Sequence, residues 1–371
     1  MKVRDICGAL EDLAPSGLAY EGDPVGLSVG HPDWEVSRVL VTLSVTPDAA
    51  KAALRKKAEL IVSHHPVIWR PLRTLRTDAP DAASAHTRLC LELVQARVAC
   101  VAAHTNLDVV PGGVNDVLAD LLGLLRRKPL FAVPQAGFVK LVTFVPAKHL
   151  AAVRDAVCKA GAGVIGNYTH CSFSASGVGT FLPNEEADPF SGEKHRVNEE
   201  PEQRFETLVP KARVSGVVKA LLAAHPYEEV AYDLVPLENP DSTVSLGIRG
   251  ELAEAVALQA LADRVCETLK LAHVRTVGRP DRRVRKVAVL GGSGGSRVGD
   301  VAPDLDVLVT GDVGYHDALT AKEAGLALID AGHAGTERCA VEILAQFLRK
   351  RFKSLRVFTY DEPEVFQVTT R

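Results

Sequence analysis

The sequence has no long apolar run and no cysteine motif. None of its windows offers the roughly 18 uninterrupted apolar residues of a membrane-spanning helix, and the residues after Met1 lack the apolar core of a signal peptide. The seven cysteines are dispersed without CxxC spacing, and their odd number argues against a full disulfide framework. We therefore expect a cytoplasmic protein that does not contact a membrane.

An excess of charge of either sign is also absent. The 371 residues carry a formal net charge of −3, and the basic clusters, such as 282–286, are short. This balance gives no electrostatic basis for general nucleic-acid binding. No cysteine stands beside the clustered histidines, which argues against a cysteine nucleophile.

Short apolar runs that end in metal-binding residue types are the main signal in this sequence. Four such runs lead into polar loops, which read SHHP from residue 63, HTNLD from 104, GDVGYHD from 311 and AGHAGTE from 331. Five of the twelve histidines fall in these loops: His64, His65, His104, His316 and His333. In open α/β sheets ligands bind beyond the carboxyl ends of the strands, so we expect the loops to share one cleft.

Spacing within these loops favours a site for two metal ions. His64 and His65 are adjacent at a strand end, so their side chains should point in roughly opposite directions and serve two ions, or one ion and a substrate. His333 and Glu337 stand four residues apart at a helix start, where Glu337 also suits the helix dipole. Together with Asp108, these residues supply enough nitrogen and oxygen ligands for two divalent ions with open positions.

The order of apolar and polar patterns indicates two structural regions. Over residues 1–136 and 241–371 strand-like runs alternate with helical stripes, including a helix over 253–269, which predicts an α/β domain with a mostly parallel sheet. Residues 137–240 show two strand–helix halves joined by turns and hairpins over 161–204, which is typical of a ferredoxin-like α+β module. Because metal-competent loops lie on both sides of 137–240, we interpret this segment as an inserted domain.

A glycine-rich loop, Gly291–Ser296, follows a predicted strand. It does not fit the GxGxxG fingerprint, because Arg297 occupies the place of the third glycine, and it has no P-loop Lys-Ser/Thr pair. Its backbone N–H groups suit a phosphate, so we predict Gly292, Ser293 and Gly294 as substrate contacts. A tight turn that needs positive φ is the alternative.

The motifs SHHP, HTNLD, TGDVGYHDA and DAGHAGTE, in this order, resemble those of the GTP cyclohydrolase I type 2 homologue family, also called Nif-three-like proteins. The resemblance extends over nearly the whole chain and matches the long form of the family. It includes HPYEE at 225–229, which on its own we interpret as packing and hydrogen-bonding groups. The family implies an α/β core with a dinuclear metal site in a cleft, and a homohexamer of stacked trimers. It also implies that residues 137–240 are similar to the trimer-forming PII and CutA signalling proteins.

Carried over motif by motif, the resemblance implies as metal ligands His64, His65, Asp108, His333 and Glu337, with His104 and His316 close by. Two segments depart from the family. Gly22-Asp23-Pro24 stands where Trp-Asp-Asn is usual, and Leu43-Ser44-Val45-Thr46 stands where Leu-Asp-Val-Thr is usual. Loss of an acidic group behind a ligand typically weakens metal affinity or activity about 10–100-fold. Since all five candidate ligands are present, we expect metal binding to survive and the substrate preference to change.

We interpret the chain as a metal-dependent hydrolase of a nucleotide-like or phosphate-containing small molecule, since the family name refers to opening of the GTP imidazole ring. Water acidified by two divalent ions would attack carbon or phosphorus, and His104 or His316 would transfer the proton. Zinc is the expected metal, while iron, manganese and cobalt suit the same ligands. Two alternatives stay open: a non-catalytic metal-binding regulatory protein that uses 137–240 to bind partners, and a metal-dependent phosphoesterase or nuclease.

Overall fold

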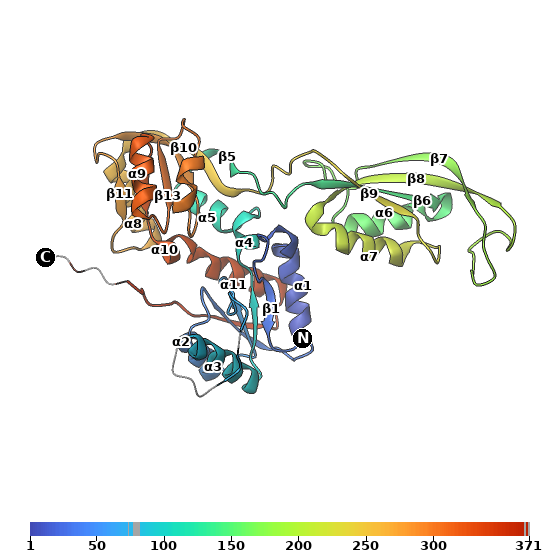
Figure 1. Ribbon diagram of the computed structural model, residues 1–371, viewed down its shortest axis with the longest axis horizontal. Coiled ribbons are helices and arrows are strands. Elements are labelled where there is room, and N and C mark those ends of the chain that lie inside the picture. The colour runs from blue at the N-terminus through green and yellow to red at the C-terminus, as the bar shows by residue number, and fades with distance from the viewer. Residues whose placement is uncertain (73, 77–81, 367–368, 370–371) are drawn as a thin grey trace. The chain divides into compact units, whose positions relative to one another are not determined.

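The computed structural model describes residues 1–72, 74–76, 82–366 and 369. They form two compact units (Figure 1): a core unit, Met1–Val133 with Ser242–Arg371, and a middle unit, Pro134–Asp241. Within the described ranges, no helix has the length and apolar character that crossing a bilayer requires. The chain is a mixed α/β protein with three sheets, two in the core unit and one in the middle unit.

The first core sheet has five strands in the order β1-β4-β3-β2-β15. Their bounds are Gly26–Val29 (β1), Arg38–Thr42 (β2), Leu60–Ser63 (β3), Ala99–Ala102 (β4) and Arg356–Thr359 (β15). All neighbours pair in parallel except β1, which is antiparallel to β4. Every residue of β3 and β4 is buried, because a parallel sheet is covered on both faces, and this explains their unbroken apolar runs.

The second core sheet has six strands in the order β11-β14-β13-β12-β10-β5. Their bounds are Leu125–Phe131 (β5), Leu246–Ala257 (β10), Arg275–Val277 (β11), Arg283–Val289 (β12), Val307–Thr310 (β13) and Ala327–Asp330 (β14). The three central strands are parallel as predicted, but β11, β10 and β5 pair antiparallel, so this sheet is mixed rather than mostly parallel. Antiparallel strands at the margin of a parallel sheet are common in large α/β sheets.

The predicted helix over 253–269 is wrong in its first turn. Residues 253–257 continue β10, where Val256 and Ala257 pair with β12 after an irregularity in register, and the helix α8 begins at Leu258. The alanines and the glutamate of this segment have good helix propensity. Pairing with β12 outweighs that weak preference.

The helices of the core unit connect and cover the two sheets. They are Val3–Leu13 (α1), Pro47–Lys56 (α2), Ala82–Gln95 (α3), Thr105–Val109 (α4), Val114–Leu121 (α5), Leu258–Leu269 (α8), Tyr315–Glu323 (α9), His333–Glu337 (α10) and Cys339–Arg351 (α11). Short 3₁₀ turns lie at Ser16–Leu18 and Gly295–Asp300. α2 and α3 bury their apolar stripes against the first sheet, where Leu40, Ile61 and Leu93 share one cluster.

The middle unit is an antiparallel sheet with two helices on one face. The strands, in the order β7-β8-β6-β9, are Phe138–Pro146 (β6), Ser172–Phe181 (β7), Asn198–Pro210 (β8) and Tyr232–Pro236 (β9). The helices α6, Leu150–Lys159, and α7, Val214–Ala224, lie side by side along the sheet (Figure 1) and enclose Phe205 and Leu221 with it. The region 161–204 contains β7 and the start of β8, which form one long hairpin. This agrees with the hairpins predicted for that region. That this unit is an inserted PII- and CutA-like domain stays a prediction.

Candidate metal centre

Histidines from three of the four polar loops converge at the carboxyl ends of core-unit strands. His64 and His65 follow β3, His104 follows β4, and His333 opens α10 just after β14. The imidazole ring of His65 lies 5.2 Å from those of His64 and His333, centroid to centroid, and the rings of His64 and His104 are also 5.2 Å apart. Strand ends therefore bring together residues that lie up to about 270 positions apart in the sequence, as expected of an α/β sheet.

The candidate ligands form two groups that share Glu337. His64, Asp108 and Glu337 form one group and His65, His333 and Glu337 the other, each with its ligand atoms within 4.8 Å of one another. Glu337 Oε1 lies 3.8 Å from His64 Nε2, whereas Oε2 lies 2.8 Å from His65 Nε2 and 2.9 Å from His333 Nε2. Each carboxylate oxygen faces one group, so Glu337 is the residue that two ions would share.

The first group contains two polar atoms that have no hydrogen-bond partner in the described part of the chain. His64 Nε2 and Asp108 Oδ1 are buried, lie 3.5 Å apart, and have no hydrogen-bond partner among the described residues. His64 Nδ1 is held by the carbonyl oxygen of Ala103 at 2.8 Å, which leaves Nε2 as the nitrogen directed at Asp108. An unsatisfied buried polar group costs about 1–3 kcal/mol, so a cation between these atoms would relieve both. The residues present fit a metal ion.

The pKa shifts in the cluster also indicate that these residues suit a bound cation. Burial lowers the pKa of His64, but the Asp108 and Glu337 carboxylates outweigh it and raise the pKa to about 9. A hydrogen bond to Glu337 is the main cause that raises the pKa of His333 to about 9, against burial. Burial acts to raise the pKa of Glu337, but hydrogen bonds from His333 and His65 and the nearby imidazole of His64 reverse this and lower it. Protons on the imidazoles thus compensate the carboxylates, and divalent cations would displace those protons.

The carboxylate of Asp23 orients His104. Asp23 belongs to the segment Gly22-Asp23-Pro24 that departs from the family, and nothing else in the sequence indicated this role. The Nδ1 atom of His104 donates to Asp23 at 2.9 Å, and Thr105 donates to the same buried carboxylate through both its backbone nitrogen and its hydroxyl. Burial would raise the pKa of Asp23, but the hydrogen bonds from His104 and Thr105 outweigh it and lower the pKa. With Nδ1 engaged, Nε2 is the free nitrogen, and His104 forms a third group of possible ligands with His64 and His65.

His65 is also oriented by a neighbouring side chain, that of Ser44, which lies in the second segment that departs from the family. A hydrogen bond of 2.9 Å joins its Nδ1 to the hydroxyl of Ser44. The Ser44 backbone nitrogen and the Thr42 hydroxyl both donate to the carboxylate of Glu362, the latter at 2.8 Å. Glu362 therefore places an acidic group behind the loop where the family usually has aspartate. It lies 318 positions from Ser44, so no sequence pattern indicated it.

The fourth loop contributes Asp312 rather than His316. Asp312 accepts a hydrogen bond of 2.7 Å from His333 Nδ1, and its position within the GDVGYHD motif was the available sequence signal. His316 is exposed in the first turn of α9, where its ring contacts that of Tyr315 at 5.3 Å. The structure places His316 in none of the ligand groups and not on the walls of the cleft.

The three residues predicted to contact substrate have different surroundings. Gly292 lies against the histidine and carboxylate cluster, since a Cβ atom there would overlap Oε1 of Glu337, and its φ of +67° is one that glycine adopts readily. A Cβ at Gly294 would instead meet the side chains of Thr310 and Leu290. Ser293 lines the cleft and donates to Asp312. Gly292 thus makes room for Glu337, and a substrate contact of this loop stays a prediction.

A cleft of about 560 Å³ opens beside the cluster within the core unit. Residues that no metal group includes also line it: Tyr20, Trp69, Ser293, Ser296 and Arg297. The indole of Trp69 is more than half exposed and its ring lies 5.3 Å from that of His104. The cleft therefore joins the histidine and carboxylate cluster to aromatic rings, hydroxyls and one guanidinium.

Fold and site together define an α/β protein with a histidine and carboxylate cluster of the kind that holds metal ions at strand ends. A family model described as Duf34/NIF3 (NGG1p interacting factor 3) matches residues 1–364. The chain belongs to this family, which confirms the resemblance seen in the sequence motifs.

Relatives and solved structures agree over almost the full length. The chain is 40% identical to the "GTP cyclohydrolase 1 type 2 homolog" of Halalkalibacterium halodurans, over 94% of this chain and 92% of the relative. It is also 40% identical to the Bacillus subtilis protein of the same name, over 89% and 87%. Its fold matches the crystal structure of a Bacillus cereus protein related to NIF3, with a TM-score of 0.82, 37% identity and coverage of 100% and 99%.

Proposed function

We propose that this protein is a divalent-metal-dependent hydrolase that acts on a nucleotide-like or phosphate-containing small molecule. The observation that carries the proposal is the unsatisfied pair His64 and Asp108 beside a carboxylate, Glu337, that faces two groups of histidines. Two divalent ions, zinc in the first instance, would be held by His64, His65, Asp108, His333 and Glu337. Ions in such sites act as Lewis acids and generate a nucleophile from water at neutral pH.

The walls of the cleft support a substrate with an anionic group and a flat ring. Arg297 presents a guanidinium beside the cluster, and its charge is fixed at physiological pH. It also pairs with Asp300 at 2.7 Å and lies over the ring of Phe131 at 4.4 Å, so its position is held from two sides. Trp69 and Tyr20 offer aromatic faces to a base, and the Ser293 and Ser296 hydroxyls can bond phosphate oxygens.

We assign proton transfer to His104 rather than His316. His104 lines the cleft, and Asp23 fixes its Nδ1, so its Nε2 can accept and return a proton at the reacting centre. Exposed His316 lies outside the cleft lining.

The test combines metal content with turnover. Purified wild type and the variants His64→Ala and His333→Ala would be analysed by plasma mass spectrometry, then reloaded with zinc, iron, manganese or cobalt and assayed with GTP, other nucleotides and simple phosphoesters. We expect about two ions per wild-type chain and loss of ions and turnover in both variants. His316→Ala is the matched control, since it removes an exposed histidine and should keep the metals. A metal-free wild type that cannot be reloaded would overturn the proposal.

A non-catalytic, metal-binding regulatory protein is the second candidate, because the middle unit contains a large cavity of its own. It predicts metal binding without product from any member of the panel. A phosphoesterase or nuclease would use the same ions and differ from the main proposal only in which substrates turn over. In either case we propose a homohexamer built from trimers, which light scattering of the purified protein can test.

A further inference from the structure

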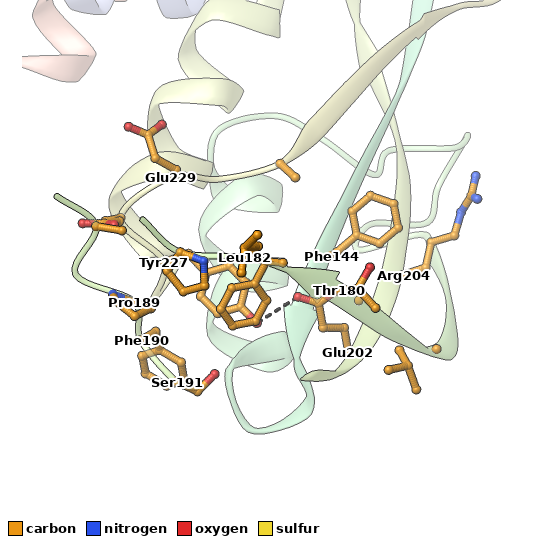
Figure 2. A pocket seen from close by; sticks show the side chains of 18 of the residues that line it. Phe144, Thr180, Leu182, Pro189, Phe190, Ser191, Glu202, Arg204, Tyr227 and Glu229 are labelled. Atoms are coloured by element: carbon orange, nitrogen blue, oxygen red, sulfur yellow. Dashed lines mark hydrogen bonds between the residues drawn. The ribbon is translucent and has the colours of Figure 1, made fainter. Parts of the chain in front are cut away.

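The middle unit contains a cavity of about 680 Å³, lined only by its own residues. It lies between the β7–β8 hairpin and the HPYEE segment at 225–229 (Figure 2). Cavities of about 300–1,000 Å³ are typical of sites for small organic ligands. The HPYEE motif therefore contributes to a cavity wall, a role that the metal-site proposal does not explain.

Aromatic rings form a large part of this wall. Phe144, Phe181, Phe190 and Tyr227 all line the cavity. The ring of Tyr227 lies 5.8 Å from that of Phe190, centroid to centroid, and Figure 2 shows the two on the same side of the cavity. The ammonium group of Lys148 lies 4.7 Å from the centroid of Phe190, so one of these rings already holds a cation.

A carboxylate is held among these rings. The Tyr227 hydroxyl donates to Glu202 Oε1 at 2.8 Å, the contact drawn as a dashed line in Figure 2. The other oxygen of Glu202 lies against Gly179 of β7, where a Cβ atom would overlap it. Burial, followed by the hydrogen bond to Glu202, raises the pKa of Tyr227, so its hydroxyl stays protonated and keeps donating. The glycine and the tyrosine together fix the carboxylate at the cavity wall.

The HPYEE segment is held in place before any ligand arrives. His225 is buried, its Nε2 donates to the carbonyl oxygen of Phe144 at 3.0 Å, and its Nδ1 accepts from the backbone nitrogen of Tyr227 at 3.2 Å. These two bonds define one neutral tautomer. Glu228 accepts from the backbone nitrogen of Asp188 at 2.9 Å, which ties the segment to the 187–191 loop. A preformed wall reduces the ordering cost of binding.

The charges of the lining are unbalanced toward the negative. Glu202, Glu228 and Glu229 line the cavity against a single cation, Arg204. Arg204 is already paired with Glu206 at 2.8 Å, and Figure 2 shows its side chain extending away from Tyr227. The carboxylate beside Tyr227 therefore lacks a cationic partner among the residues that the structure describes around it.

We propose that this cavity binds a small organic cation, an amine with an apolar or aromatic body. The ammonium group pairs with Glu202 and the body packs on the rings of Phe190 and Tyr227. Aromatic faces attract cations as well as apolar groups, so both parts of the ligand find partners in one site. The inference goes beyond the hydrolase proposal and does not depend on the metal cluster.

The test uses the full chain and three probes of one shape and different charge: tryptamine, its neutral alcohol analogue indole-3-ethanol, and indole-3-propionate. Binding would be measured by titration calorimetry. We expect tryptamine to bind at least about tenfold more tightly than the alcohol, with no binding of the carboxylate. Equal affinities, or no binding of tryptamine at millimolar concentration, would overturn the proposal.

Two variants locate the site, and a third variant is the control. Glu202→Gln keeps an acceptor for Tyr227 and removes only the charge, so the preference for tryptamine should disappear. Gly179→Ala should displace the carboxylate without changing its charge and weaken binding by at least about tenfold. Glu199→Gln, an exposed glutamate on the same strand β8, should bind as wild type. Circular dichroism confirms that each variant is folded.

Two results contradict this assignment. Unchanged binding in both Glu202→Gln and Gly179→Ala would place tryptamine elsewhere. Absence of binding together with protection of β7 amides that grows with protein concentration would assign the cavity wall to contact with a second copy of the chain.

Discussion

The histidine and carboxylate cluster and the middle-unit cavity share one local arrangement. In each, a glutamate lies over a glycine at which a Cβ atom would overlap the carboxylate: Glu337 over Gly292, and Glu202 over Gly179. In the cluster the neighbouring His64 and Asp108 are buried and unsatisfied. In the cavity the carboxylate already accepts from a tyrosine hydroxyl.

This difference favours a permanently bound ligand at the cluster and an exchangeable ligand in the cavity. Buried polar atoms without partners destabilise the fold until a cation joins them, so the cluster is incomplete by itself. In the cavity the Glu202 carboxylate has a hydrogen-bond partner without a ligand, and Glu202 is only partly buried. A tightly held metal therefore suits the first site, and reversible binding suits the second.

The largest expected effect comes from Glu337→Gln. Glu337 is the one member common to the two candidate ion groups, so loss of its charge should remove both ions and leave the imidazoles with weaker partners. Metal content by plasma mass spectrometry should fall close to zero. Glu202→Gln is the matched control in the other site and should keep the full metal content. Retention of both ions in Glu337→Gln would show that this carboxylate does not bridge.

Gly292→Ala should have the next largest effect. The new methyl group would push the Glu337 carboxylate, and the φ of +67° adds roughly 1–2 kcal/mol of backbone strain for a residue with a Cβ. We expect lower metal content and a lower melting temperature. Gly299→Ala is the control, because a Cβ there meets nothing within 4 Å among the described residues. If both variants melt alike and hold equal metal, the glycine does not make room for Glu337.

A smaller effect is expected from the acidic groups behind the histidines. Glu362→Gln weakens the hold on Ser44, which positions His65, so metal affinity should fall about 10–100-fold while the fold stays intact. Competition with a chelating dye measures this. The control is Asp361→Asn, a highly exposed neighbour paired only loosely with Arg338 at 3.6 Å, which should keep wild-type affinity. An equal loss in both variants would instead indicate general loosening of the segment.

The sequence predicted the ligand cluster because its members follow strands. His64, His65 and Asp108 come after buried parallel strands, and parallel strands end at one edge of the sheet, so the convergence follows from local pattern and topology. The supporting carboxylates follow no such rule. Asp23 meets His104 across 81 positions and Glu362 meets Ser44 across 318, and only the folded chain brings them together.

The errors in the fold have a similar cause. The segment 253–257 has helical composition, and pairing with β12, a contact outside its own sequence, makes it a strand. In the middle unit the sequence predicted hairpins over 161–204 but gave no bounds for β7, whose residues are mostly exposed and include Gly177 and Gly179. Its pairing with β8 comes from the ladder of backbone hydrogen bonds along the hairpin.

The smallest predicted effect is a pH dependence confined to the middle unit. Burial is the main cause that lowers the pKa of His225 below its usual 6.5. The unfolded chain therefore binds a proton at this residue more readily, and the free energy of unfolding should fall as the pH drops from about 6.5 through the folded-state value. Hydrogen exchange of β6 and β8 amides, corrected for intrinsic rates, would report it in the full chain. His225→Gln keeps a donor toward Phe144 and cannot titrate, so its profile should be flatter. A wild-type profile with the same slope would mean that His225 contributes nothing to the pH dependence, and that the wall beside Tyr227 stays intact in acid.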